Sequence, residues 1–424
     1  MRLKTRRTRP QPAGYVKVSP ENEKELGPDP HQEEYDAACN PPPPRVEAPE
    51  PVLAVSATPS PETNDRDSSP GITIGDYQDC HYVASGVTAE VYRAQTRALK
   101  VIVETHNIEP HSPQREAKIL ASLRASNAPN IIPLLETFRD PQTQNFVLVF
   151  PYAPLTLADL LSTHQPPSSP LPTPLIRTIF TALFRALHHL HIHESIIHRD
   201  IKPSAILLTT ASPTTPSQIH LSDFGTAWHP TLSPPTTGDG DEPPTQKVLE
   251  VGTGPYRAPE TLFGDRAYGP GIDLWAAGAT LAECFLRRPL FDSPPAHEDG
   301  SQLGLVLSLF KTLGTPTPET WPEAVGFRTP PFEMYRVFEG RVRMEGWEGV
   351  VPGAEGGWRG LVEGMLRFES GERATAGEVS ASFFFLFFLL SCCVGVVGGG
   401  ADLSEIGVGV FLYERGGRDL NLRG

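Results

Sequence analysis

The sequence of 424 residues is poor in cysteine, has no excess of positive charge, and carries few large apolar side chains in its first 70 residues. The five cysteines form neither a C-x-x-C pair nor an evenly spaced framework. This pattern excludes a cysteine-rich zinc module and is typical of a reducing compartment. We therefore expect the protein in the cytoplasm or the nucleus.

The formal net charge of −14 at pH 7 bears on the class of partner. A surface that follows nucleic-acid phosphates normally needs a basic excess, so we expect no nucleic-acid partner. The basic run over residues 2–9 has three readings: a nuclear-import signal, a fragment of a presequence, or a solvated terminus without function. No apolar segment of a secretory signal follows it.

Residues 1–75 read as a disordered, proline-rich segment. The first 70 residues hold 14 prolines, four of them consecutive at Pro41–Pro44. Such a stretch buries too little apolar surface to offset the entropy lost on ordering. The remaining length is ample for a hydrophobic core.

The order of the predicted elements indicates strands first and helices afterwards. Apolar alternation and a β-branched run predict strands over 81–94, 98–103 and 145–150. Helical patterns cover 114–123, 175–192, 272–285 and 302–313. The order predicts a small β-rich lobe followed by a larger helical lobe. Two stretches, 166–174 and 230–246, read as loops by composition.

Six short motifs occur in order along the chain. The most specific is His198-Arg199-Asp200, because Asp200 precedes the Asp223 of Asp223-Phe224-Gly225 by 23 residues. The other signals are Lys100 at the end of a predicted strand, Glu116 on the next helix, Ala258-Pro259-Glu260, and Asp273-Leu274-Trp275. Alone, each residue is more often a surface lysine or a helix-capping aspartate. Together, in this order, they indicate one shared site.

From about Tyr77 to Thr375 the chain resembles the eukaryotic protein kinase superfamily. Its second half resembles the cyclin-dependent kinase branch in three runs: Tyr256 to Glu260, Arg287 to Phe291, and Phe310 to Pro316. The resemblance implies an α+β, bilobal protein kinase fold over 76–380, with an N-lobe over 76–153 and a C-lobe over 154–380. It also implies a serine/threonine kinase that uses ATP and Mg²⁺ and acts on protein substrates, other kinases among them.

The resemblance assigns roles that suit phosphoryl transfer, which needs cations and alignment more than covalent help. Asp200 is expected to accept the proton of the substrate hydroxyl, Lys202 to steady the γ-phosphate, and Asp223 to ligate Mg²⁺. Lys100, held by Glu116, is expected to grip the α- and β-phosphates. The whole expected ATP-binding set is Val83, Gly86, Val91, Ala98, Lys100, Glu116, Phe150 behind the adenine, Tyr152 and Ala153 at the hinge, and Leu207.

Two departures from the family pattern affect the nucleotide site. Ala205 stands where the family places an asparagine that ligates the second Mg²⁺, and a methyl group cannot coordinate a metal. The missing ligand predicts a loss in turnover on the order of 10²-fold or more. In the glycine-rich loop only Gly86 remains, with Ala84 and Ala89 at the outer positions. Alanine is still small, so nucleotide binding is expected to survive.

Two further departures concern activation. Pro113 falls in the helix that a cyclin grips in the family, and it suits a first helical turn better than an interior. This speaks against a cyclin-like partner and matches fungal monomeric kinases that phosphorylate cyclin-dependent kinases. The family's activating threonine aligns with Val248, which has no hydroxyl. Arg199 remains available for a phosphate, and Thr245 is either a substitute site or an ordinary loop threonine.

The tail over 381–424 is apolar and rich in glycine. The segment 381–397 is at the short limit for a membrane span, and we expect no membrane partner. A second reading is translated intron sequence from about Val379, because Val379-Ser380 can be encoded by a typical intron start and pyrimidine-rich codons give phenylalanine. A genuine, soluble tail would leave an apolar patch that promotes aggregation.

Two principal hypotheses about function stay open. The first is an active kinase, which Lys100, Asp200 and Asp223 favour. The second is a pseudokinase that holds nucleotide or a partner with little turnover, which Ala205 and the reduced glycine-rich loop favour. A third, a membrane-tethered signalling protein, depends wholly on the tail.

Overall fold

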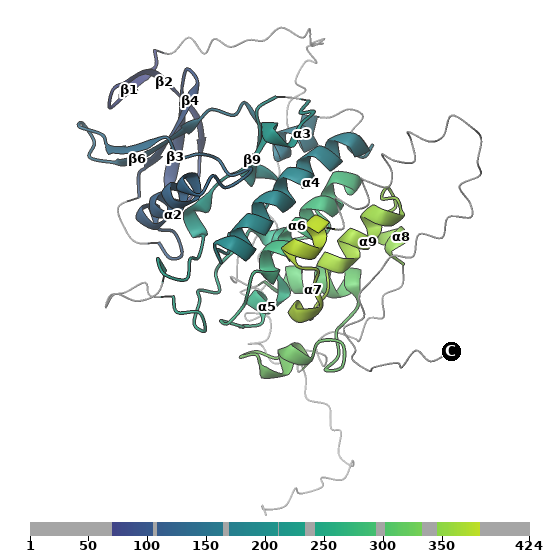
Figure 1. The fold of residues 1–424 in the computed structure, drawn as a ribbon. Helices are drawn as coiled ribbons and strands as arrows, with labels where there is room; N and C mark the ends of the chain where they lie inside the picture. Colours follow the sequence, from purple (N-terminus) through teal and green to yellow (C-terminus); the bar gives the residue numbers. More distant parts are fainter. Residues whose placement is uncertain are drawn as a thin grey trace, which may run out of the picture. The chain divides into compact units, whose positions relative to one another are not determined.

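The computed structural model describes residues 70–104, 108–163, 169–210, 212–233, 242–293, 302–332 and 346–381. All of them belong to one compact unit, in which a β-rich lobe precedes a helical lobe (Figure 1). The expected disorder of residues 1–69 and the readings of the tail beyond Ala381 lie outside the described residues. The described helices include none that is long and apolar enough to cross a membrane.

The N-lobe is built on an antiparallel sheet with the strand order β1-β2-β3-β4-β6-β5. Its strands are β1 (Ile72–Ile74), β2 (Tyr77–Ser85), β3 (Ala89–Ala94), β4 (Arg97–Ile102), β5 (Glu136–Arg139) and β6 (Phe146–Pro151). Residues 70–75, which were expected to belong to the disordered segment, are described and contain β1. β1 already pairs with β2, and Ile74 is buried beside Cys80 in the core of the lobe.

The alternation of side chains along β4 decides on which face of the sheet Lys100 lies. Leu99 and Val101 pack with Val147 and Val149 of β6 in a core that belongs to the N-lobe alone. Ile102 packs on the opposite side, in the large core that also includes residues of helix α2 (Pro113–Ala125). Because successive side chains of a strand point to opposite faces, Lys100 shares the face of Ile102.

Helix α2 (Pro113–Ala125) lies against this face of the sheet (Figure 1). Its N-cap is Ser112, whose Oγ accepts a hydrogen bond from the Arg115 N–H at 3.4 Å. Pro113 occupies the first turn, as expected, where its missing N–H leaves no intrahelical bond unmade. The apolar face of α2, with Ile119, Leu120 and Leu123, is buried in the core.

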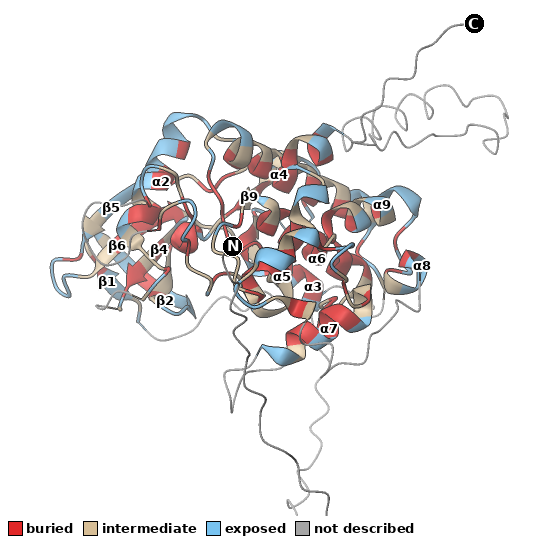
Figure 2. Ribbon diagram, turned by 90° about the horizontal axis from the view of Figure 1, so that it is seen from below, coloured by how far each residue is buried: buried red, intermediate tan, exposed pale blue. Residues whose placement is uncertain are grey.

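The C-lobe is mainly helical and surrounds α6, which is buried over almost its whole length (Figure 2). A helix that is apolar all round belongs in the interior. The helices are α3 (Leu157–Thr163), α4 (Thr173–His188), α5 (Pro259–Leu262), α6 (Gly271–Leu286), α7 (Leu303–Leu313), α8 (Trp347–Val350) and α9 (Gly356–Met365). A small sheet joins β7 (Leu155–Thr156), β8 (Ile206–Leu208) and β9 (Ile219–Leu221).

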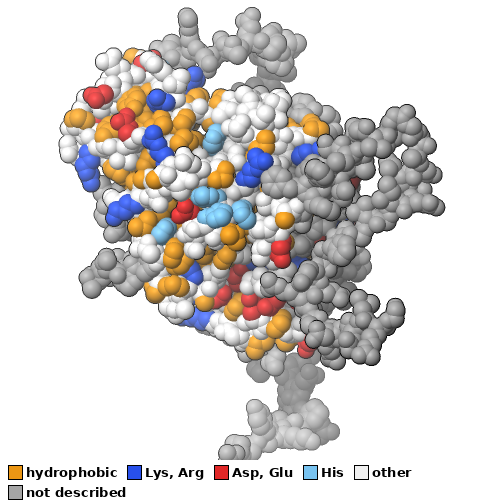
Figure 3. Space-filling model, in the orientation of Figure 1, with side chains coloured by type: hydrophobic (Ala, Val, Ile, Leu, Met, Phe, Trp, Pro, Cys, Tyr) orange, Lys and Arg blue, Asp and Glu red, His pale blue; other side chains and the backbone are white. Residues whose placement is uncertain are grey.

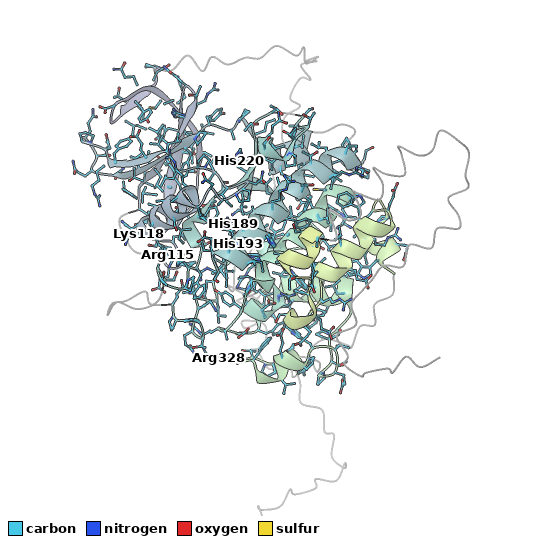
Figure 4. The ribbon with its side chains drawn as sticks, in the orientation of Figure 1. Arg115, Lys118, His189, His193, His220 and Arg328 are labelled. Carbon is cyan, nitrogen blue, oxygen red and sulfur yellow. The ribbon has the colours of Figure 1, made fainter. Side chains whose placement is uncertain are left out.

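The predicted helices are confirmed with small changes at their ends. α4 begins inside the stretch expected to be a loop, because Pro174 is tolerated in a first turn. It then changes to a π-helical turn, His189–His193. His189 and His193 lie together on one face with their rings 5.3 Å apart (Figure 4), and histidine side chains gather in the middle of this face (Figure 3). His189 Nε2 lies 3.3 Å from the Oγ of Ser126, which follows α2. The two lobes therefore also touch at this end of α2.

Candidate active site

Lys100 is the N-lobe residue of the site. Its Nζ donates to both carboxylate oxygens of Glu116 on α2, at 2.8 and 2.9 Å, and to Asp223 Oδ1 at 3.1 Å. Burial acts to lower the pKa of Lys100, but the charges of Glu116 and Asp223 outweigh it and raise the pKa. The amino group is therefore a fixed cation that points toward the C-lobe.

Asp223 comes from the C-lobe and follows β9. Its backbone is left-handed, with φ 62°, and the next residue, Phe224, is fully buried against His198 with the two rings 4.7 Å apart. The Asp223 side chain is 47% exposed and can be reached from solvent. The charge of Lys100 holds the pKa of Asp223 well below its usual range. This carboxylate is therefore ionised and accessible.

Asp200 and Lys202 form a second group of charges with a partner that the sequence reasoning missed. Lys202 Nζ donates to Asp200 Oδ2 at 2.5 Å and to Thr253 Oγ1 at 3.0 Å. The Thr253 hydroxyl in turn donates to Asp200 Oδ1 at 2.7 Å. Thr253 belongs to none of the motifs found in the sequence, and no spacing rule links it to Asp200.

The loop that carries Asp200 is held by the first turn of α6. Asp273 Oδ2 accepts from the His198 N–H and Asp273 Oδ1 accepts from the Arg199 N–H, both at 2.8 Å. Arg199 has φ 73°, a conformation that L-residues rarely adopt. Two backbone hydrogen bonds to one buried carboxylate hold this turn and so fix the direction of the next residue, Asp200.

The side chain of Arg199 was expected to be available for a phosphate. It is instead buried and forms an ion pair with Glu242, with Arg199 Nη1 2.5 Å from Glu242 Oε1. The expectation is wrong because Glu242 already occupies the guanidinium group. Nothing in the sequence indicated this partner, because Glu242 lies in a stretch that has the composition of a loop. The described parts of that stretch, 230–233 and 242–246, do lack helix and strand, as predicted.

The apolar residues expected around the adenine lie on neighbouring strands. Ala98 pairs with Phe150 across β4 and β6, and Val91 pairs with Lys100 across β3 and β4. Phe150 belongs to the core that connects the lobes, and Ala98 and Leu207 are partly buried against this core. The Tyr152 N–H donates to Thr96 O at 2.9 Å, and Ala153 follows directly. Val83 is 45% exposed at an irregularity of β2.

Gly86 follows β2, and packing of the protein does not require a glycine there. A β-carbon at Gly86 would meet only the Ala89 carbonyl oxygen, at 3.8 Å. The missing side chain therefore leaves room for a ligand that approaches the backbone. This space, the Lys100 ammonium and the Asp223 carboxylate have the chemistry that a magnesium-bound polyphosphate needs.

The described residues hold no group of three or more histidine, cysteine or acidic side chains that could hold a metal ion by themselves. Mg²⁺ commonly takes one or two carboxylates and completes its shell with phosphate and water oxygens, so Asp223 fits this pattern. Ala205 is buried at the end of the loop that carries Asp200. Its carbonyl oxygen accepts two hydrogen bonds from Ser222, one from the backbone N–H at 2.9 Å and one from the side-chain hydroxyl at 3.0 Å. Its methyl group offers no ligand.

Comparison with known proteins agrees with this geometry. The sequence profile of the protein kinase domain matches residues 77–385. The serine/threonine-protein kinase CAK1 of Saccharomyces cerevisiae is 29% identical over 58% of this chain and 76% of its own length. The serine/threonine-protein kinase csk1 of Schizosaccharomyces pombe is 29% identical over 72% and 92%. Cyclin-dependent kinase 7 of Xenopus laevis is 33% identical over 62% and 69%. The chain belongs to the protein kinase family, with relatives among the cyclin-dependent kinases and similar enzymes.

Proposed function

We propose that the protein transfers the γ-phosphate of ATP to serine or threonine hydroxyls of protein substrates. The observation that carries this proposal is the meeting of Lys100 from one lobe with Asp223 from the other, beside the Asp200 and Lys202 pair. Bound Mg²⁺ and ATP would supply the phosphoryl group and neutralise its charge. The residues of the chain then have to orient the nucleotide and manage one proton.

Each charged group has one task in this proposal. Lys100, kept in place by Glu116, binds the α- and β-phosphates, and Asp223 ligates Mg²⁺. Asp200 accepts a hydrogen bond and then the proton from the attacking hydroxyl. Lys202 lies 2.5 Å from Asp200, so its ammonium group is placed to steady the γ-phosphate beside the attacking hydroxyl. The apolar set around Phe150 receives the adenine.

The finer points of the proposal concern substrate and location. Lys202 favours serine and threonine over tyrosine by family resemblance. By family resemblance, Arg257 favours a preference for proline after the target residue. Its side chain packs close to Gly252, whose φ is 80°. We propose other kinases of the cell cycle or of transcription as substrates, action without a cyclin-like partner, and a location in the nucleus or cytoplasm.

A transfer assay with labelled ATP and generic protein substrates tests the proposal, run with Mg²⁺ and again with Mn²⁺. The expected result is labelling that is lost in the Asp200→Asn variant. Peptides that differ only in proline or alanine after the target serine test the preference. Labelling that persists in Asp200→Asn comes from a contaminant, and its absence in every condition rejects the proposed activity.

A pseudokinase is the second candidate, favoured by the buried methyl group of Ala205. Lys100 and Asp223 are sufficient to hold a nucleotide, whereas turnover needs more electrostatic stabilisation. ATP binding measured by calorimetry, combined with no labelling in the transfer assay, would select this candidate.

A further inference from the structure

The chain between Asp223 and Glu260, here called the activation segment, contains a buried carboxylate, Glu242, that accepts four hydrogen bonds. Its Oε1 accepts from Arg199 Nη1 at 2.5 Å and from the Val248 N–H at 2.8 Å. Its Oε2 accepts from Arg199 Nη2 at 3.0 Å and from Arg115 Nη1 at 3.3 Å. One carboxylate therefore joins the activation segment, the loop of Asp200 and helix α2.

The two arginines need an anion between them. Burial and the positive charge of Arg199 lower the pKa of Arg115. Burial alone would raise the pKa of Glu242, but hydrogen bonds and charge from Arg199, with help from Val248 and Arg115, hold it below its usual value. A buried cation without a partner is strongly destabilising, so the ionised carboxylate stabilises both guanidinium groups.

The backbone N–H and the carbonyl oxygen of Glu242 both form hydrogen bonds. The Glu242 N–H donates to Ser233 O at 3.0 Å, and the Trp228 indole N–H donates to Glu242 O at 2.8 Å. Arg199 has little capacity left for a further anion, because its Nε donates to Thr226 O at 2.5 Å and its Nη1 also donates to the Tyr268 hydroxyl at 3.1 Å. The carboxylate is thus a fixed part of the folded lobe.

The positions of the two arginines connect this cluster to the reaction. Arg115 directly precedes Glu116, the partner of Lys100, and Arg199 directly precedes Asp200. Arg115 lies at the end of α2 that is nearer the C-lobe (Figure 4). Val248, whose N–H contacts Glu242, stands where the family has its activating threonine. The carboxylate therefore lies where a phosphate on that residue would be bound.

We propose that Glu242 is a positioning residue that takes the place of an activating phosphate. It holds Arg199 and Arg115, and through them sets Asp200 and Glu116 for transfer in the unphosphorylated protein. This inference rests on the proposed kinase activity. It leaves Thr245, an exposed residue of the same segment, as an ordinary loop threonine.

Steady-state kinetics of three variants test the role. Glu242→Gln keeps the size of the side chain and removes its charge, and we expect kcat to fall on the order of 10-fold or more with the KM for ATP nearly unchanged. Glu242→Asp keeps the charge and should restore part of kcat. Thr245→Ala is the matched control and should behave as wild type. A Glu242→Gln variant with wild-type kcat overturns the proposal.

Phosphatase treatment tests the replacement of phosphate directly. The wild-type protein should keep its full activity after treatment, with no phosphate on peptides that cover residues 242–260. Loss of activity on treatment, together with phosphate mapped to Thr245 or a neighbour, overturns the proposal.

A measurement without turnover separates this inference from the proposed function. Hydrogen exchange of the nucleotide-free protein should be faster in Glu242→Gln than in wild type over α2 and over residues 196–203, while α6 stays protected. If the wild type transfers no phosphate, the proposed function fails and the exchange still decides the role of Glu242. Equal exchange in the two proteins removes the positioning role, and loss of protection throughout the domain assigns Glu242 to stability alone.

Discussion

At the residue scale, the hydroxyl of Thr253 contacts both Asp200 and Lys202, the two groups that we propose to act on the substrate hydroxyl and the γ-phosphate. Thr253→Val keeps the shape of the side chain and removes the hydrogen bonds to Asp200 and from Lys202. We expect kcat to fall roughly 10-fold, because the proton acceptor loses one of its fixed partners. Thr253→Ser keeps the hydroxyl and should stay close to wild type in the same assay. Equal kcat for the valine and serine variants would contradict this role.

Ala205 allows a gain of function to be tested. Ala205→Asn restores an amide oxygen where the family ligates a second Mg²⁺, and we expect kcat to rise on the order of 10²-fold with a lower requirement for Mg²⁺. Ala205→Leu has a similar size without a ligand atom and controls for crowding at this buried position. Activity should be measured over a series of Mg²⁺ concentrations. If both variants fold and neither gains activity, the missing ligand does not limit turnover.

The motif residues of the site could be predicted from their order along the chain, and Glu116 as the partner of Lys100 from the family resemblance. Thr253 and Glu242, the further partners of the site, could not. Lys100, Asp200 and Asp223 belong to short motifs whose spacing indicates a shared chemistry. Glu242 belongs to no motif and is separated from Arg199 by 43 residues. Composition correctly predicts that Glu242 lies in a loop, but it does not predict that the side chain is buried. Only the fold shows that two arginines converge on it.

At the scale of one element, helix α2 connects the Glu242 cluster to Lys100, because Arg115 contacts Glu242 and the next residue, Glu116, binds Lys100. Its first turn depends on the Ser112 side chain. Ser112→Ala should lower the free energy of unfolding by about 1 kcal/mol, as is usual for the loss of an N-cap. Ser122→Ala, on an exposed position of the same helix, should be neutral or slightly stabilising because alanine has the higher helix propensity. Urea unfolding of the two variants checks the difference, and equal midpoints would show that the cap contributes nothing.

The types of the elements were predictable because their periodicity is strong, and the misses have local causes. β5 was not predicted, since its residues Glu136–Arg139 are mostly exposed and carry no apolar alternation. The end of α4 was placed at 192, whereas the regular helix ends at His188 and continues as a π-helical turn. Apolar periodicity does not distinguish these two kinds of helix.

At the scale of the whole molecule, a buried ion pair joins the last described segment to the centre of the C-lobe. Arg373 Nη1 and Nη2 contact Glu260 Oε1 and Oε2 at 2.6 and 2.7 Å. Arg373→Met leaves the Glu260 carboxylate buried without its partner and should cost about 3–5 kcal/mol of stability. Arg367→Met removes an exposed pair, Arg367 with Glu372, and should cost less than about 1 kcal/mol. Comparable losses in thermal unfolding would contradict this assignment.

The division into two lobes could be predicted from the order of strands and helices, but the contacts between lobes could not. The composition of residues 1–75 concealed β1, because three residues are too few to show alternation. The contacts that bring Lys100 to Asp223 depend on packing between residues 123 positions apart. No local pattern in the chain reports such a distance, and only the family resemblance indicated it.

Acid should destabilise the molecule through Asp273, which ties α6 to the loop of Asp200. Burial would raise the pKa of Asp273, but the hydrogen bond from His191 and the charge of His198 hold it below the usual 3.8. The unfolded chain therefore takes up this proton first, so the contribution of Asp273 is complete above about pH 4 and is lost as the pH falls through the folded pKa. Urea unfolding between pH 3 and 6 should show this decline, and Asp273→Asn should be less stable at pH 6 with a shallower dependence below about pH 4. An equally steep decline in the variant would assign the acid sensitivity to other carboxylates, such as Asp223 and Glu242.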